Sequence, residues 1–161
     1  MKIRQAKPEE LSEIMEIYDT ARGFMREHGN PTQWNSGYPS RKLVEEDCRE
    51  RRLYVCEEGG TLAGVFMFAM DPDPTYARIY EGQWLNDAAY GTMHRMASSG
   101  KVKGVSACCL DWCFEQCGNV RGDTHGDNYV MQHVFEKNGF QKCGIIYVED
   151  GTPRIAYQRM K

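Results

Sequence analysis

Residues 94–106 read His94-Arg95-Met96-Ala97-Ser98-Ser99-Gly100-Lys101-Val102-Lys103-Gly104-Val105-Ser106. This pattern predicts a strand, a short loop of glycine and lysine, and then the start of a helix. Such a loop presents several backbone N–H groups, and the helix dipole adds partial positive charge at the same place. Lys101 and Lys103 add two full charges. The turn therefore suits a phosphate or pyrophosphate, although the same pattern is typical of an ordinary helix start.

A second segment predicts a neighbouring strand and helix. It begins Gly122-Asp123-Thr124-His125-Gly126-Asp127-Asn128, and its helix closes in Phe135-Glu136-Lys137-Asn138-Gly139-Phe140. Gly139 is the residue expected in the left-handed cap that ends the helix.

The loop at 100–104 lacks both the Gly-Lys-Ser/Thr ending of triphosphate-binding loops and the Gly-x-Gly-x-x-Gly pattern of dinucleotide sites.

Apolar periodicity and turn residues predict the other elements. The interval 75–90 resists assignment. Elsewhere we expect strands at 2–6, 53–57, 61–70, 91–97, 120–125, 143–148 and 154–159, and helices at 8–25, 41–50, 105–116 and 128–138. The order β-α-α-β-β-β-α-β-α-β-β predicts the α/β class, with helices flanking a mixed, twisted sheet.

Length and charge narrow the protein class. A chain of 161 residues fits a single domain, 1–161. Its net charge of −3 argues against nucleic acid as a partner. The sequence has no apolar run of the length that spans a bilayer and no apolar N-terminal stretch typical of a signal peptide. We therefore expect a soluble, cytoplasmic protein that binds neither nucleic acid nor membrane.

Four of the seven cysteines fall in one predicted helix, at 108, 109, 113 and 117. A metal or redox site is one interpretation. Zinc sites, however, favour close pairs of ligands with a second pair elsewhere in the chain. We therefore expect no metal and interpret these cysteines as small buried apolar side chains in a reducing compartment.

The two segments together resemble the GNAT superfamily of acetyl-CoA-dependent N-acetyltransferases. The family's loop has the form Gln/Arg-x-x-Gly-x-Gly/Ala, and here it reads Lys101-Val102-Lys103-Gly104-Val105-Ser106. Its later asparagine and the helix end Tyr-Glu-Lys-x-Gly-Phe resemble Asn128 and the segment 135–140. The family's order of elements matches the one above over nearly the whole chain. This resemblance implies a mostly antiparallel GNAT sheet and acetyl-CoA as co-substrate.

The resemblance also implies roles for particular residues. The strand edge should pair with the pantetheine arm like an added strand, the loop should take the pyrophosphate, Asn128 should bond the pantetheine or phosphate region, and Lys137 should lie near the adenosine. Asn128 could equally be a helix cap. The implied cofactor-binding residues are Met96, Ala97, Ser98, Lys101, Val102, Lys103, Gly104, Val105, Ser106, Asn128 and Lys137.

Catalysis requires a neutral amine, so a base is expected. Glu81 is the first candidate because Tyr80 and Trp84 flank it and could desolvate its carboxylate. His94 is a weaker candidate. Asp123 and His125 share a strand face and are expected to form a structural pair.

Other family features concern the acceptor and the acid. Trp34 and Tyr38 could line the acceptor pocket or pack as a lid. Many family members place a tyrosine acid where this chain has Phe135, which cannot donate a proton; Tyr147, Tyr157 or a water are alternatives. The expected function is acetyl transfer to a primary amine of a small molecule or peptide. A non-catalytic CoA-binding module is the alternative, and a homodimer is one state common in the family.

Overall fold

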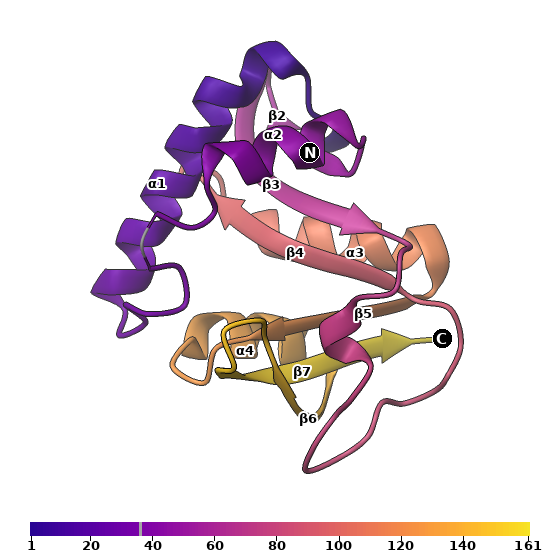
Figure 1. Cartoon of the computed structure of the whole chain (residues 1–161). Coiled ribbons are helices and arrows are strands. Elements are labelled where there is room, and N and C mark those ends of the chain that lie inside the picture. The colour runs from indigo at the N-terminus through magenta and orange to yellow at the C-terminus, as the bar shows by residue number, and fades with distance from the viewer. Residues whose placement is uncertain (36) are drawn as a thin grey trace.

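The computed structural model describes residues 1–35 and 37–161, and its centre is a seven-stranded sheet. The strand order is β1-β2-β3-β4-β5-β7-β6. Figure 1 shows the N-terminal strands in one half of the sheet and β5, β6 and β7 in the other. The strands are β1 (Lys2–Gln5), β2 (Leu53–Glu58), β3 (Thr61–Ala69), β4 (Gly91–Ser98), β5 (Asn119–Thr124), β6 (Gln141–Tyr147) and β7 (Pro153–Met160).

One pair of neighbouring strands is parallel, and it separates after two residues. β4 pairs with β5 at Gly91–Val120 and Thr92–Arg121, and in the part of the chain that the structure describes no further pair joins them. Figure 1 shows the two strands meeting at one end and diverging toward the other. The edge of β4 that faces β5 is therefore free of a strand partner from Met93 onward, among the described residues.

A bulge in β4 lies beside this divergence. Val65 of β3 faces Ala97, whereas Met67 faces His94, so β4 carries one extra residue there. Arg95 has φ +52°, a left-handed conformation that costs energy for a residue with a side chain. The bulge turns neighbouring side chains away from the regular alternation of the strand.

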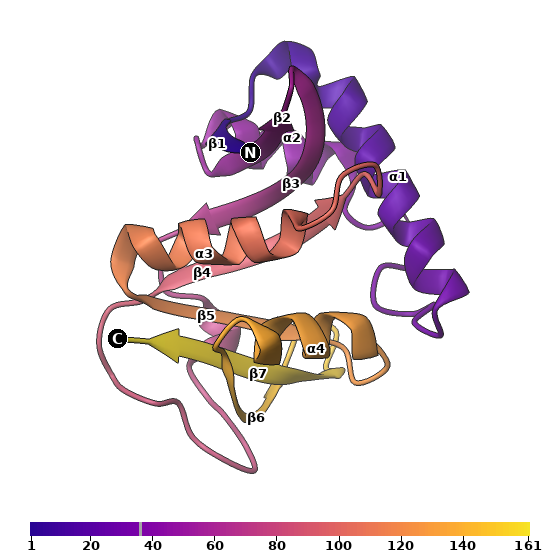
Figure 2. The same cartoon turned by 180° about the vertical axis from the view of Figure 1, so that it is seen from behind.

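The helices cover both faces of the sheet, as the opposed views in Figures 1 and 2 show. α1 (Leu11–Glu27) and α2 (Arg41–Arg49) lie on one face, and α3 (Val105–Cys117) and α4 (Tyr129–Lys137) on the other. A short 3₁₀ turn, η1 (Pro8–Glu10), precedes α1. Ser40 caps α2, because its hydroxyl accepts from the Leu43 N–H at 3.2 Å.

The interval 75–90, which the sequence leaves unassigned, is a packed loop. It begins in a short 3₁₀ turn, η2 (Pro74–Tyr76). The rings of Tyr76 and Trp84 pack at a tilt, with 5.1 Å between their centroids. Arg121 of β5 lies over Trp84 at 4.2 Å and over Tyr90 at 4.1 Å. These contacts come from side chains distant in sequence, so they leave no periodic pattern.

The expected order of elements is otherwise confirmed, with ends shifted by a few residues. Among the helices of the described residues, none has the length and apolarity needed to cross a bilayer.

Candidate active site

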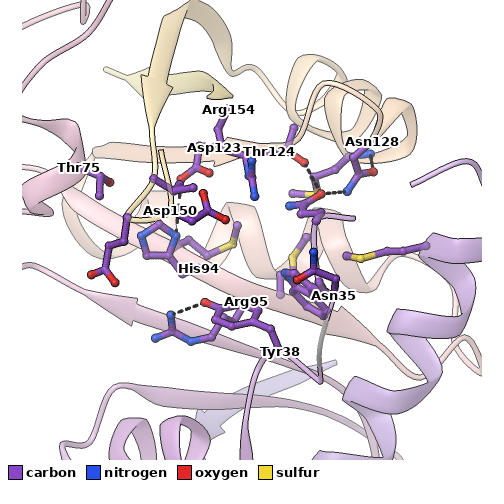
Figure 3. Close-up of a pocket in the computed structure, with 18 of the residues that line it drawn as sticks. Asn35, Tyr38, Thr75, His94, Arg95, Asp123, Thr124, Asn128, Asp150 and Arg154 are labelled. Atoms are coloured by element: carbon purple, nitrogen blue, oxygen red, sulfur yellow. Dashed lines mark hydrogen bonds and ion pairs between the residues drawn. The ribbon is translucent and has the colours of Figure 1, made fainter. Parts of the chain in front are cut away.

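A cavity of about 450 Å³ opens where β4 and β5 diverge. Its wall comes from β4, β5, the start of α4, the loop after α1, the η2 segment and the β6–β7 hairpin. Figure 3 shows the polar side chains that face into it, among them Asn35, Tyr38, Thr75, His94, Arg95, Asp123, Thr124, Asn128, Asp150 and Arg154. Segments that are far apart in the sequence thus each contribute polar side chains to the wall of one cavity.

His94 lies between two carboxylates in this cavity. Its Nε2 is 2.6 Å from Oδ2 of Asp73, and its Nδ1 is 3.8 Å from Oδ2 of Asp123. The shorter contact is a hydrogen bond and the longer one is not. The carboxylate of Asp73 therefore favours the tautomer with the proton on Nε2, which leaves the lone pair on Nδ1. The gap between Nδ1 and Asp123 has the width in which a small donor group could bond to both.

The two carboxylates have different partners. Burial alone would raise the pKa of Asp73, but the hydrogen bond and charge of His94, with bonds from Thr75, lower it to about 2. Asp123 accepts a hydrogen bond from the buried Tyr76 hydroxyl at 2.6 Å. Burial, and then the neighbouring Asp123 charge, raise the pKa of Tyr76 well above its usual value. Tyr76 thus remains a neutral donor that orients Asp123.

The free edge of β4 leads directly to the glycine and lysine loop. β4 ends at Ser98 and α3 begins at Val105, with Gly104 at φ +80° as its N-cap. The hydroxyls of Ser98 and Ser99 accept from the N–H groups of Gly100 and Lys101 and so order the turn. Lys101, Lys103 and Gly104 are exposed, Val102 and Ser106 are half-buried, and Val105 is buried. The structure therefore brings the strand edge Met96, Ala97 and Ser98 together with the expected loop.

Asn128 is the N-cap of α4, which is one of the two roles that the sequence left open for it. Its Oδ1 accepts from the Met131 N–H, and its Nδ2 donates to Oε1 of Gln33, both at 2.9 Å. It also lines the cavity. Gln33 was missed by sequence analysis; it joins the loop after α1 to α4. Lys137 lies in the last turn of α4, exposed and at the other end of that helix from Asn128, so the structure does not bring it to the cavity.

Both aromatic residues expected near the acceptor line the cavity. Trp34 is buried and stacks edge-on with Tyr18 at 5.7 Å and with Tyr38 at 6.3 Å. Tyr38 is more exposed, and its hydroxyl accepts from Arg95 at 3.3 Å. This aromatic pair therefore forms part of the cavity wall.

The expected burial of Glu81 is wrong. Glu81 is exposed at φ +56° and lies outside the cavity wall. Trp84 turns instead toward Tyr76, whose carbonyl accepts from the indole N–H at 3.0 Å, and Tyr80 packs against Tyr147. The carboxylate is therefore not desolvated by its sequence neighbours.

The expected pairing of Asp123 with His125 is also wrong. The His125 ring accepts from the Asp127 N–H at 2.9 Å and contacts Thr32 at 3.3 Å, whereas Asp123 faces His94 and Tyr76. The signal that could have found His94 and Asp123 is the parallel pairing of the two strands that carry them. The parallel register joins residues 29 apart, 91 with 120 and 92 with 121, and His94 and Asp123 differ by the same 29.

Phe135 fills the place of the family's tyrosine with a buried ring. It stacks on Tyr157 at 4.7 Å and packs at a tilt against Phe140 at 5.1 Å, both measured between ring centroids. A Cβ on Gly122 would lie 2.9 Å from this ring, so β5 requires glycine there. Burial raises the pKa of Tyr157 to about 12, and neither Tyr157 nor Tyr147 is among the described residues that line the cavity. Tyr38 is the cavity-lining phenol in the described part of the chain.

The cysteine-rich helix α3 buries two of its four cysteines in the core. Cys109 and Cys113 are fully buried against the sheet, and Cys108 and Cys117 are partly buried. Among the described residues, no group of three or more His, Cys, Asp or Glu side chains has the arrangement of a metal site.

Solved structures with the same fold include several acetyltransferases. One, an acetyltransferase of the GNAT family from Streptococcus agalactiae, is 34% identical, covers 99% of this chain and 95% of its own, and has a TM-score of 0.91. A ribosomal-protein-alanine N-acetyltransferase from Brucella melitensis is 15% identical over the full length of both chains, with a TM-score of 0.67. AAC(6')-Ib, in complex with ribostamycin and coenzyme A, is 15% identical over 99% of this chain and 93% of its own, also at 0.67. No family model and no curated protein matches the chain.

Proposed function

The chain belongs to the GNAT family of acetyltransferases, and on that premise we propose that it transfers the acetyl group of acetyl-CoA to a primary amine of a small molecule or peptide, with His94 as the base. One observation carries this proposal. The free edge of β4 opens into the same cavity that holds His94 between Asp73 and Asp123. A donor arm laid along that edge would end beside a group that can accept a proton. AAC(6')-Ib, which shares the fold, is complexed with coenzyme A and an aminoglycoside, and this supports a small amine as acceptor.

The cofactor-binding roles that the family resemblance implies are part of this proposal, and the same geometry supports them. The backbone of Met96, Ala97 and Ser98 would bond the pantetheine arm as an added strand would. The loop 101–106 would bind the pyrophosphate through its N–H groups, because the first N–H groups of α3 lack helical partners. Asn128 would shape the wall near the arm while it caps α4.

In the reaction, His94 Nδ1 accepts a proton from the bound ammonium, and the Asp123 carboxylate holds the cation in place. The neutral amine forms the C–N bond, a β4 N–H near Met96 donates to the thioester oxygen as charge builds on it, and the C–S bond breaks. Asp73 fixes the imidazole and stabilises its protonated form. The proton that the amine nitrogen loses as it becomes an amide passes through water or Tyr38 to the departing CoA thiolate; a thiol of ordinary pKa, about 8.5, is a fair leaving group.

Acetyl-CoA is expected to stabilise the protein. At about 100 times its Kd the ligand should add about 2.7 kcal/mol to the free energy of unfolding, which raises Tm by about 5–10 °C for a chain of this size. Differential scanning fluorimetry checks the shift. Release of free CoA thiol with a panel of amines then separates an acetyltransferase from a non-catalytic CoA-binding module: a shift without any thiol release would favour the module, and no shift would contradict both.

The exposed position of Glu81 leads to a second expectation. Glu81→Gln should leave kcat/KM within about twofold of the wild type, because surface substitutions away from a site rarely disturb it. The thiol-release assay measures this directly. A loss of tenfold or more would contradict this expectation and would return Glu81 to the role of base.

A further inference from the structure

Arg154 is a buried cation of the cavity wall. It lies near the start of β7, and only 9% of its surface is exposed. One terminal nitrogen donates to the Thr152 hydroxyl at 3.0 Å and to the Pro153 carbonyl at 2.8 Å. Among the described residues, no carboxylate lies within ion-pair distance of its guanidinium. Figure 3 shows the side chain pointing from β7 into the cavity.

The other groups near Arg154 are already engaged. Arg95, the second arginine of the wall, pairs with the buried carboxylate of Asp47 at 2.8 Å. Asp150 accepts from the backbone N–H of Thr152 at 2.9 Å, within its own hairpin. The bonds from Thr152 lower the pKa of Asp150, and the Arg154 charge helps to lower it without an ion-pair contact. Asp123 is held by Tyr76. A guanidinium that is nine-tenths buried normally has an anionic partner, since burial of an unpaired charge is costly.

The register of β5 and β7 sets the reach between Arg154 and the proposed amine site. Asp123 faces Ala156, so Arg154 lies two residues nearer to the start of β7, on the same face of the sheet. Diagonal neighbours of this kind have Cα atoms about 7–8 Å apart. A single small molecule can therefore place its amine between His94 and Asp123 and another group at Arg154.

We propose that the acceptor is an amine that also carries a carboxylate, an amino acid or a compound built on one, and that the Arg154 guanidinium binds this carboxylate while the amine lies at His94. The inference rests on the proposed acetyl transfer and adds the class of acceptor. A planar guanidinium matches a carboxylate in charge and in the spacing of its donors. The nearby Asp123, Glu149 and Asp150 carboxylates, which also line the cavity, would repel a dianion more strongly than a single carboxylate.

The test compares amino acids with their carboxamides, which keep the size and lose the negative charge. Thiol release is measured for a panel of L-amino acids and the matching amides, with wild type, Arg154→Gln, Arg154→Lys and the control Arg41→Gln, which removes an exposed arginine of α2. Arg154→Gln should lower kcat/KM for the acids by about 10–100-fold and leave the amides nearly unchanged. Arg154→Lys should restore part of the loss, and Arg41→Gln should change neither.

Each variant is compared with the wild type on the same substrate. The difference in amine pKa between an amino acid and its amide therefore does not affect the result. Equal losses for acids and amides in Arg154→Gln would show a merely structural role and overturn the inference. So would turnover confined to amines without a carboxylate. If nothing is turned over, stabilisation of the CoA-bound protein by amino acids but not amides supports it, and its absence overturns it. Failure of acetyl-CoA to stabilise the protein would instead refute the proposed function.

Discussion

Replacement of His94 by glutamine is expected to lower kcat/KM for acetyl transfer by about 10²–10⁴-fold, the range typical for loss of a general base. Glutamine retains a donor for the Asp73 carboxylate, which lies 2.6 Å from His94 Nε2, but it has no lone pair basic enough to take a proton from an ammonium. The loss should lie mainly in kcat. Acetyl-CoA should still raise Tm, because the proposed cofactor contacts come from the β4 backbone and the loop.

Asp73→Asn separates positioning from proton transfer. An amide at this place can donate to Nε2 and would shift the proton to Nδ1, so kcat should fall although His94 remains. Its pH profile should also move, because the carboxylate no longer stabilises the imidazolium; a purely structural role would not change that profile. Full activity of His94→Gln, in a protein that acetyl-CoA still stabilises, would refute the assignment of the base. Glu81→Gln is the matched carboxylate control.

Local chemistry explains why the order of elements was predictable. Ser40 marks the start of α2 through its side-chain cap, and Gly104 and Gly118 bound α3 in left-handed conformations. These devices act within a few residues of the chain, so their sequence pattern is short and recognisable. The interval 75–90 lacks such a pattern. Its order depends on Arg121 between Trp84 and Tyr90, and on Gln158, whose side chain accepts from the Leu85 N–H at 2.9 Å.

The same distinction separates the two halves of the site. The strand edge and the loop 101–106 form one continuous segment, so sequence could place them together. The base depends on three segments, at 73, 94 and 123. The parallel register of β4 and β5 joins the last two, and the loop that begins η2 brings Asp73 to His94. Glu81 was chosen from its neighbours in sequence, and in the structure those neighbours pack elsewhere. Arg154 was missed for the same reason, since β7 reaches the cavity through its pairing with β5.

Asp47→Ala is expected to reduce the free energy of unfolding by about 3–5 kcal/mol, the range for breaking a buried ion pair. The Asp47 side chain is fully buried in α2 and accepts from Arg95 at 2.9 Å and from Arg52 at 3.0 Å. Burial alone would lower the pKa of Arg95, but Tyr38 and Asp47 together raise it. Arginine is always charged in proteins, so the guanidinium stays charged after Asp47 is lost. An uncompensated charge would then remain beside the β4 bulge.

Urea unfolding checks this prediction, with Glu50→Gln as the matched control. Glu50 is an exposed partner of Arg52 at 2.8 Å, and its loss should cost less than about 1 kcal/mol. The double variant Asp47→Val, Arg95→Met distinguishes a stranded charge from lost packing. If the charge is responsible, the double variant should recover much of the stability, since apolar replacement of a buried pair is often neutral. Recovery should not extend to activity, because Arg95 donates to Tyr38 and lies next to His94 in the strand. A single variant Asp47→Ala as stable as the wild type would show that the buried pair contributes nothing to the fold.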